Sequence, residues 1–298
     1  MTAPLPSAEE LRALAARDGI DAATERLYRR VLESPLHGPF IRRVDELRDQ
    51  PAAVPEWSCG AVLAIVPGAS YKETPRTGAD GRLVREQAER MGIPTVLVPL
   101  ATTGTVKENS RILRDWLASQ PDRPVILASV SKGGSDIKVA LAEPDAERAF
   151  RNVAAWVNLC GILDGTPLID WLLSKSPGAG AVRLYYRLRG KGTAFLRELQ
   201  YRSGGPLDQS LRLLPHIQLI SVAGFPLREH LTRRSSRNCH ERLTPLGPND
   251  GALVLADVCA LPGLLYPVWG ADHYLQPKGG AGPLVRAILR YLNETLGG

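Results

Sequence analysis

Residues 125–142, VILASVSKGGSDIKVALA, decide how the rest of the chain is interpreted. The stretch begins with a short apolar run after Pro124, which is typical of a strand buried on both faces. It then passes through small residues around Ser131 and continues in a helical pattern from about Gly134. A serine at a sharp turn between a strand and a helix is the setting of a nucleophile elbow. The stretch therefore predicts that Ser131 is a nucleophile.

The residues around Ser131 fit such a turn, in which strand and helix approach closely. The positions two before and two after the serine carry the small residues Ser129 and Gly133, although a glycine is usual at the first. The N–H groups at the start of the following helix would face a developing oxyanion. Lys132 is unexpected there, because a cation opposes the partial charge of a helix N-terminus. We expect its side chain to point to solvent, and contact with an anionic substrate group is the alternative.

Length and composition indicate one large α/β domain, with or without an insertion. The chain has 298 residues, 44% of them hydrophobic, and no apolar run approaches the length of a membrane span. The N-terminus has early acidic residues and no continuous apolar segment, so we expect no secretory signal and a cytoplasmic protein. Four cysteines without ligand spacing predict reduced, mostly buried thiols and no metal: Cys59, Cys160, Cys239 and Cys259.

The net charge of +6 is mild for this length and comes mainly from arginine. No reading motif for nucleic acid accompanies it, so a solvated basic face is expected, with attraction of acidic substrates as the alternative. The chain contains no glycine-rich phosphate-binding motif and no H-E-x-x-H. We therefore expect no nucleic-acid partner and no cofactor.

The order of apolar runs along the chain predicts a doubly wound, mainly parallel sheet. Residues 7–50 have helical spacing, with a capping box from Ser7 to Glu10. Strands and amphipathic helices alternate from residue 61 onward, which predicts right-handed crossovers. The expected strands are 61–66, 94–98, 125–128, 153–159, 217–223 and 264–269.

The chain is expected to divide into three parts. Residues 1–52 would form a helical segment that packs on the core, and residues 53–160 with 216–298 would form the α/β core. Between them, residues 161–215 interrupt the alternation and are rich in Leu, Tyr, Trp and Arg. We interpret this segment as a helical cap, and the alternative is one long crossover helix with loops.

A serine nucleophile needs a base and an acid that orients the base. His273 lies in the right place, directly after the last predicted strand in LLYPVWGADHYL, and His216 or His240 would serve if the strand count were off by one. Asp250, in the turn-forming sequence PNDG, is the preferred acid. Asp164 is the second choice. Asp272 ranks lower because neighbouring residues such as Asp272 and His273 tend to point apart.

An oxyanion hole requires two N–H donors that are fixed before the reaction. The amide of Lys132, directly after the nucleophile, is one candidate. The loop after the first strand should supply the other, because Gly68 frees the backbone there and Ala69 or Ser70 provides the amide.

The motifs VPGAS (66–70), SVSKGG (129–134), PNDG (248–251) and WGADH (269–273) make the chain resemble the α/β-hydrolase superfamily of serine esterases and lipases. The resemblance runs from about residue 61 to the C-terminus and leaves out the N-terminal helices and the cap. It implies an eight-stranded sheet, a Ser131–Asp250–His273 triad and no cofactor. It does not imply a substrate.

The expected function is hydrolysis of a carboxylic ester or related acyl substrate, a small molecule, through an acyl-enzyme on Ser131. The cap would line the pocket with four residues: Trp171, Leu172, Tyr185 and Tyr186. The alternatives are an acyltransferase or thioesterase with the same triad, and a non-catalytic binding protein on the same fold. Association into a homodimer is left open.

Overall fold

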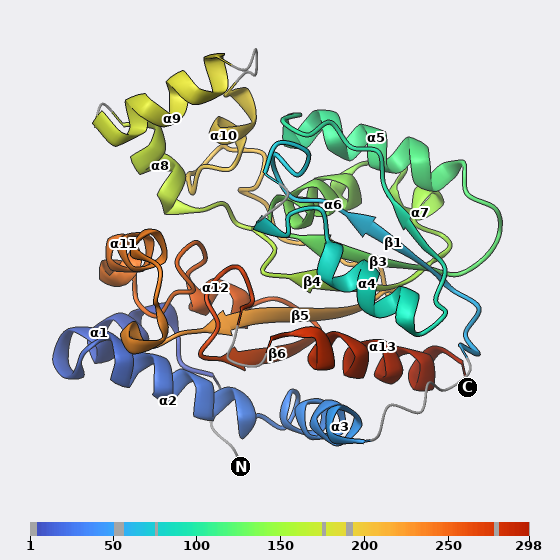
Figure 1. Ribbon diagram of the computed structural model, residues 1–298, viewed down its shortest axis with the longest axis horizontal. Coiled ribbons are helices and arrows are strands. Elements are labelled where there is room, and N and C mark those ends of the chain that lie inside the picture. Colours follow the sequence, from blue (N-terminus) through green and yellow to red (C-terminus); the bar gives the residue numbers. More distant parts are fainter. Residues whose placement is uncertain are drawn as a thin grey trace.

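A computed structural model describes residues 5–50, 57–74, 77–174, 177–188, 193–276 and 280–297. In these ranges six strands form one parallel sheet in the order β2-β1-β3-β4-β5-β6 (Figure 1). The strands are β1 Val62–Val66, β2 Thr95–Leu97, β3 Val125–Val130, β4 Val153–Leu159, β5 Gln218–Phe225 and β6 Leu264–Trp269. All six predicted strands are confirmed to within two residues. The described residues form six strands and not the eight that the resemblance implies.

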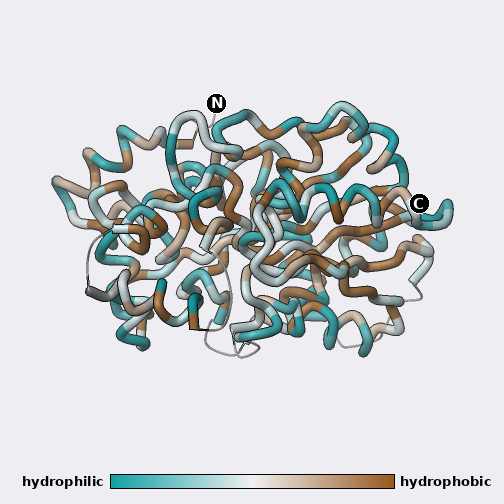
Figure 2. The backbone as a smooth tube through the Cα atoms, turned by 90° about the horizontal axis from the view of Figure 1, so that it is seen from above, coloured by the Kyte–Doolittle hydropathy of each residue, from teal (hydrophilic) through white to brown (hydrophobic). Residues whose placement is uncertain are grey.

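Helices cover both faces of the sheet, which confirms the doubly wound architecture. Alternate residues of β1 point to opposite faces, so Leu63 and Ile65 join one apolar cluster while Val62, Ala64 and Val66 join another. The first cluster includes α4 (Arg82–Arg90) and α13 (Gly282–Leu296), and the second includes α5 (Val106–Ala118), α6 (Lys132–Ala142) and α7 (Ala146–Ala149). Figure 2 shows hydrophobic and hydrophilic residues alternating along the helices, as expected for helices with one buried face.

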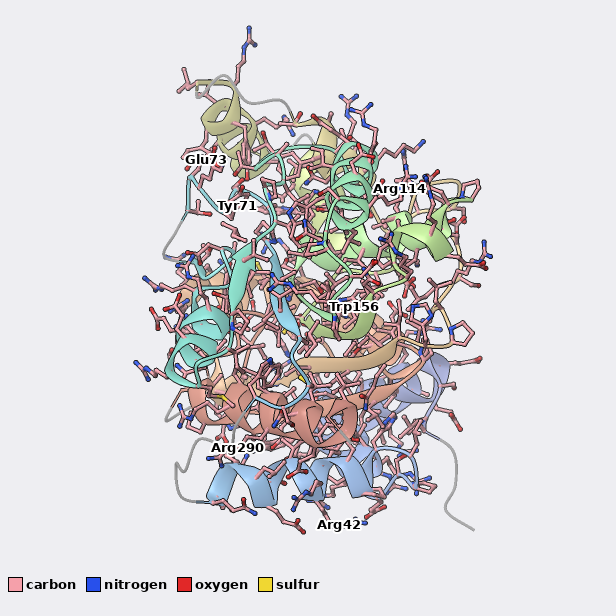
Figure 3. The ribbon with its side chains drawn as sticks, turned by 90° about the vertical axis from the view of Figure 1, so that its right-hand side faces the viewer. Arg42, Tyr71, Glu73, Arg114, Trp156 and Arg290 are labelled. Atoms are coloured by element: carbon pink, nitrogen blue, oxygen red, sulfur yellow. The ribbon has the colours of Figure 1, made fainter. Side chains whose placement is uncertain are left out.

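The N-terminal helices lie along the edge strand β6 (Figure 1). They are α1 (Ala8–Asp18), which begins at the predicted capping box, α2 (Ile20–Leu32) and α3 (Gly38–Asp49). His37 Nδ1 accepts a hydrogen bond from the amide of Leu265 on β6 at 3.3 Å, and the hydroxyl of Tyr266 donates to Asp45 at 2.6 Å. Arg290 of α13, labelled in Figure 3, donates to the carbonyl of Leu47 in α3 at 3.0 Å. These helices therefore cover an edge that would otherwise expose unpaired backbone groups.

Three helices lie beyond the carboxyl ends of the strands in the described part of residues 161–215 (Figure 1). They are α8 (Pro167–Leu173), α9 (Pro177–Leu188) and α10 (Ala194–Glu198). One long crossover helix is therefore excluded. Two further helices, α11 (Arg234–Leu243) and α12 (Leu255–Cys259), follow β5 and precede β6. The division of the chain at residues 52, 160 and 215 stays a prediction.

Candidate active site

Ser131 lies at the junction of β3 and α6, at the carboxyl edge of the sheet. Its backbone has φ 49° and ψ −114°, a region that side-chain-bearing residues occupy only when the surroundings hold them there. The Ser131 amide donates to the carbonyl of Leu159 at 3.1 Å, and its carbonyl accepts from Ile162 at 3.0 Å. The helix begins at Lys132, two residues earlier than predicted. This turn is a strained elbow that leaves Ser131 partly exposed.

The small residues on both sides of Ser131 have separate reasons. A Cβ at Gly133 would lie 2.3 Å from the carbonyl oxygen of Val66, so only glycine fits there. Ser129 is buried, and its hydroxyl donates to Asn158 Oδ1 at 3.0 Å and accepts from Trp156 Nε1 at 2.8 Å. Trp156 lies in the interior of the molecule (Figure 3). The serine that replaces the usual glycine therefore belongs to a buried polar network behind the elbow.

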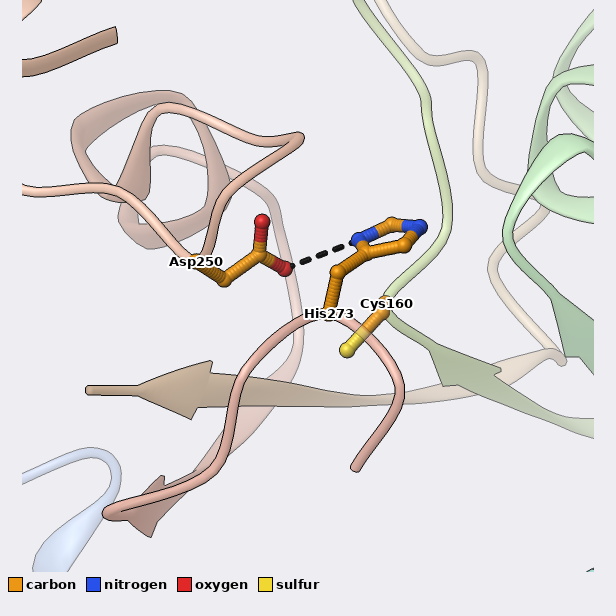
Figure 4. Close-up of side chains that lie close together, drawn as sticks. All are labelled: Cys160, Asp250 and His273. Atoms are coloured by element: carbon orange, nitrogen blue, oxygen red, sulfur yellow. Dashed lines mark hydrogen bonds and ion pairs between the residues drawn. The ribbon is translucent and has the colours of Figure 1, made fainter. Parts of the chain in front are cut away.

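The structure brings Ser131, His273 and Asp250 together. His273 Nε2 is 3.1 Å from Ser131 Oγ, and His273 Nδ1 is 3.0 Å from Asp250 Oδ2 (Figure 4). Asp250 is fully buried, and its Oδ1 accepts hydrogen bonds from the amides of Ala252 at 2.8 Å and Leu253 at 2.7 Å. Because an ionised carboxylate only accepts, Nδ1 carries the proton and Nε2 presents its lone pair to the serine.

The surroundings of His273 favour its charged form. Burial lowers the pKa of His273, but the charge and hydrogen bond of Asp250 and the charge of Asp272 outweigh burial and raise the pKa above the usual value of 6.5. Asp272 itself accepts a hydrogen bond from the Ser236 hydroxyl at 2.7 Å. An imidazolium formed at His273 is thus stabilised by two acidic neighbours.

The other candidates for base and acid lie elsewhere. Asp164 forms an ion pair with Lys138 Nζ at 2.6 Å. His216 Nε2 lies 3.1 Å from the carbonyl oxygen of Phe150. His240 is buried, and within the described residues neither of its ring nitrogens has a hydrogen-bond partner. None of these three side chains contacts Ser131 by a hydrogen bond.

The loop after β1 lies against the elbow, as expected for an oxyanion loop. A Cβ at Gly68 would lie 3.6 Å from the Cβ of Ser131. The amide of Ser70 donates to the carbonyl of Thr102 at 2.7 Å, so Ser70 is not a free donor and this part of the expectation is corrected. In the described part of the chain, no hydrogen bond uses the amides of Ala69 or Lys132. These two amides are therefore the available pair.

The side chain of Lys132 does not point to solvent, and that prediction is wrong. The side chain is buried, and its Nζ forms an ion pair with Asp136 Oδ1 at 2.6 Å. Burial of the amine is tolerated because α6 itself supplies the opposite charge one turn later. Burial raises the pKa of Asp136 to about 6, while Lys132 and a hydrogen bond from Asn109 act in the opposite direction.

A cavity of about 580 Å³ opens over Ser131 and His273. Its apolar wall consists of Leu83, Val84, Val130, Leu159 and Leu275, together with Tyr186 and Tyr274. Of the four expected cap residues, only Tyr186 lines this cavity. Trp171 instead lies under the guanidinium of Arg242, 4.2 Å from the ring centre, Leu172 packs against the core, and Tyr185 is exposed.

Sequence reasoning missed the part of the wall that comes from α4 and from the loop after β6. Tyr274 follows directly on His273, and this position was the only signal for it. Leu83 lies 13 residues after Ser70, and no motif pointed to it.

Cys160 lies beside Asp250 and His273 (Figure 4). Its sulfur and the side-chain atoms of Asp250 and His273 lie within 4.8 Å of one another, the arrangement of a metal-ligand set. Burial and the charge of Asp250 raise the pKa of the Cys160 thiol well above its usual range. The four cysteines are free, as predicted, but only Cys160 is buried and the other three are partly exposed.

Within the described ranges, no helix combines the length and the apolar character needed to cross a membrane. A scan of known protein families found no match for this chain, and a search of curated proteins found none either.

Solved structures do resemble the chain. A carboxyl esterase from a metagenome, MGS0156, has a TM-score of 0.61 at 23% identity, covering 80% of this chain and 77% of the esterase. The mature lipase BlEst2 of Bacillus licheniformis has a TM-score of 0.54 at 20% identity, covering 83% of this chain and 96% of the lipase. At these identities the likeness concerns the fold. With its parallel sheet, its elbow and these neighbours, the chain has the α/β-hydrolase fold.

Proposed function

We propose that the chain is a serine hydrolase that cleaves a carboxylic ester or a related acyl substrate through an acyl-enzyme on Ser131. One observation carries the proposal: a continuous contact from Ser131 Oγ through His273 to the buried Asp250, at 3.1 and 3.0 Å. The strained backbone of Ser131 and the fold shared with an esterase and a lipase support it.

The geometry suits acyl transfer in two steps. In the first, Ser131 Oγ attacks the acyl carbonyl while His273 Nε2 accepts its proton, and Asp250 stabilises the imidazolium. The amides of Ala69 and Lys132 donate to the oxyanion of the tetrahedral intermediate. His273 then protonates the leaving alcohol. In the second step His273 activates a water that cleaves the acyl-enzyme and frees Ser131.

The cavity wall supports an apolar acyl or aromatic group in the substrate. Its volume of about 580 Å³ falls within the range of small-molecule sites, and the side near Leu83, Val84 and Leu159 is aliphatic. The polar rim carries Arg82 and Glu86, which pair with each other at 3.8 Å. An uncharged ester with an aliphatic chain is therefore the expected substrate class.

Fluorophosphonate labelling with intact-mass measurement and peptide mapping tests the proposal. A single adduct on Ser131, absent in Ser131→Ala, is the expected result, and a panel of p-nitrophenyl esters of rising chain length then gives the preferred acyl group. A folded protein that forms no adduct and cleaves no ester of the panel would contradict the proposal and favour a non-catalytic binding protein.

A further inference from the structure

Helix α6 carries two buried lysines that the triad does not explain. The side chains of Lys132 and Lys138 are 2% and 1% exposed, and each contacts one carboxylate at 2.6 Å. Burying a charged amine is costly even when it is paired. For Lys132 the cost is increased by its place in the first turn of the helix. The buried position of the Lys132 side chain therefore needs an explanation in its contacts.

The Lys132–Asp136 pair is the first link of a buried hydrogen-bonded chain. The second carboxylate oxygen of Asp136 accepts from Asn109 Nδ2 of α5 at 3.1 Å. Asn109 also accepts from the amide of Ala101 at 3.0 Å and donates to its carbonyl at 3.2 Å. A Cβ at Gly104 would lie 2.6 Å from Asn109 Oδ1, so the backbone of the turn at residues 101–104 closes tightly around this amide. The ion pair thereby fixes the position of the turn.

The turn at residues 101–104 and Leu100 before it form hydrogen bonds with the loop after β1. The carbonyl of Thr102 accepts the amide of Ser70 at 2.7 Å, and the carbonyl of Leu100, directly before the turn, accepts the hydroxyl of Tyr71 at 2.9 Å. Figure 3 shows Tyr71 in this loop. Ser70 has a positive φ of 56°, so the loop needs such bonds to keep its shape. The residue directly before Ser70 is Ala69, whose amide has no hydrogen bond in the described residues.

We infer that Lys132 joins the two halves of the oxyanion hole. Its backbone amide is one donor, and its side chain, through Asp136 and Asn109, positions the loop that carries the other donor at Ala69. The inference rests on the proposed function. Its physical basis is that oxyanion donors stabilise the transition state only if they are in place before the reaction, and a misplacement of about 1 Å can lower the rate about 100-fold.

A purely structural role is the competing explanation, and Lys138 provides the matched control. It lies on the same helix, is equally buried and contacts its acid, Asp164, at the same distance. Its Nζ also donates to the carbonyl of Leu207 at 3.0 Å, in the segment between β4 and β5. No bond of Lys138 in the described residues leads to the loop after β1.

Two double variants test the inference: Lys132→Met with Asp136→Leu, and the control Lys138→Met with Asp164→Leu. Replacing a whole buried ion pair by apolar residues of similar volume is often tolerated by the fold. We expect the first pair to lower kcat for a p-nitrophenyl ester, and the rate of phosphonylation of Ser131, about 10- to 100-fold with KM little changed. The control pair should leave kcat near that of the wild type.

A third variant, Asn109→Leu, interrupts the chain while the ion pair stays intact. It should lower kcat by a similar factor, and adding it to the first pair should cause little further loss, because both changes break one series of bonds. Three results would overturn the inference. The first is a wild-type kcat in Lys132→Met with Asp136→Leu, and the second is an equal loss of kcat in the control double variant. The third is additivity, in which adding Asn109→Leu to the first double variant lowers kcat by its full separate factor.

Urea unfolding of each variant separates loss of rate from loss of fold. If Lys132→Met with Asp136→Leu does not fold, the kcat of Asn109→Leu is compared with that of the control double variant, and a loss in Asn109→Leu alone supports the inference. A wild-type protein that forms no adduct at Ser131 refutes the proposed function, whereas variants labelled as fast as a reactive wild type refute only this inference.

Discussion

Replacing Asp250 by Asn should convert His273 from a base into a donor. Asp250 Oδ1 accepts two backbone amides at 2.8 and 2.7 Å, so the carbonyl oxygen of the new side chain must take that place. The NH₂ group then faces His273 Nδ1, where the carboxylate oxygen is now 3.0 Å away. A donor at this point forces Nδ1 to accept. The proton of the neutral imidazole therefore moves to Nε2 and points at Ser131 Oγ.

The expected loss follows from this change of tautomer. The same substitution in serine proteases lowers kcat about 10⁴-fold, which corresponds to about 5 kcal/mol of activation free energy. Asp250 is fully buried and bonded to two backbone amides, so the substituted side chain cannot rotate to exchange the places of its oxygen and its NH₂ group. We therefore expect a loss of about the same size here.

The pH dependence gives a second readout of the same variant. In the wild type, kcat/KM should fall as the pH drops through the pKa of His273, which lies above its usual value. Without the charge of Asp250, burial lowers that pKa, so the acid limb of the residual activity should move to lower pH.

The assay is hydrolysis of the preferred p-nitrophenyl ester across the pH range, with Asp164→Asn as the matched control. Asp164 bonds to Lys138 and has no bond to a histidine in the described residues, so its variant should retain activity. A kcat of Asp250→Asn close to that of the wild type, or the larger loss in the Asp164 variant, would refute the assignment of the acid.

Three further substitutions follow from burial and close contacts. Burial lowers the pKa of His240, so the unfolded chain binds more protons below about pH 6.5 and the free energy of unfolding should fall there. Urea unfolding of His240→Leu should show a flatter dependence on pH, and an unchanged dependence would refute this reasoning. Gly133→Ala should destabilise the fold by about 1–3 kcal/mol because its Cβ would meet a β1 carbonyl at 2.3 Å, whereas Gly180→Ala, with nothing within 4 Å, should not. Leu83→Trp should shift the ester preference to shorter acyl chains, and an unchanged preference would show that the chain binds elsewhere.

The fold could be predicted because its signals are local. Each strand is a short apolar run closed by small or turn-forming residues, and Ser131 is recognised by the small neighbours that its backbone conformation requires. His273 and Asp250 could be chosen because both lie in loops that follow the carboxyl edge of a parallel sheet. The number of strands was overestimated because it came from the resemblance and not from the residues.

The surroundings of Lys132 could not be predicted in the same way. Asp136, one turn later, is visible in the sequence, but burial of the pair depends on Asn109 of another helix. Likewise, the amide of Ser70 is unavailable only because it donates to the carbonyl of Thr102, which is distant in sequence. Both errors have one physical cause. A polar group is satisfied by partners that are near in space and distant in sequence, and apolar periodicity contains no information about them.

The polar groups of the site are positioned by hydrogen bonds to β4, to their own loops and to the turn that Asn109 of α5 contacts. Ser129 bonds to β4, Asp250 bonds to the amides of its own loop, and the loop after β1 bonds to the turn that Asn109 fixes. The segment between β4 and β5 reaches this loop through the hydroxyl of Tyr186, 3.1 Å from that of Ser70. Of the apolar residues that line the cavity, only Tyr186 comes from the segment between β4 and β5, so the cavity wall and the polar groups of the site are both built mainly on the sheet and its neighbouring helices and loops.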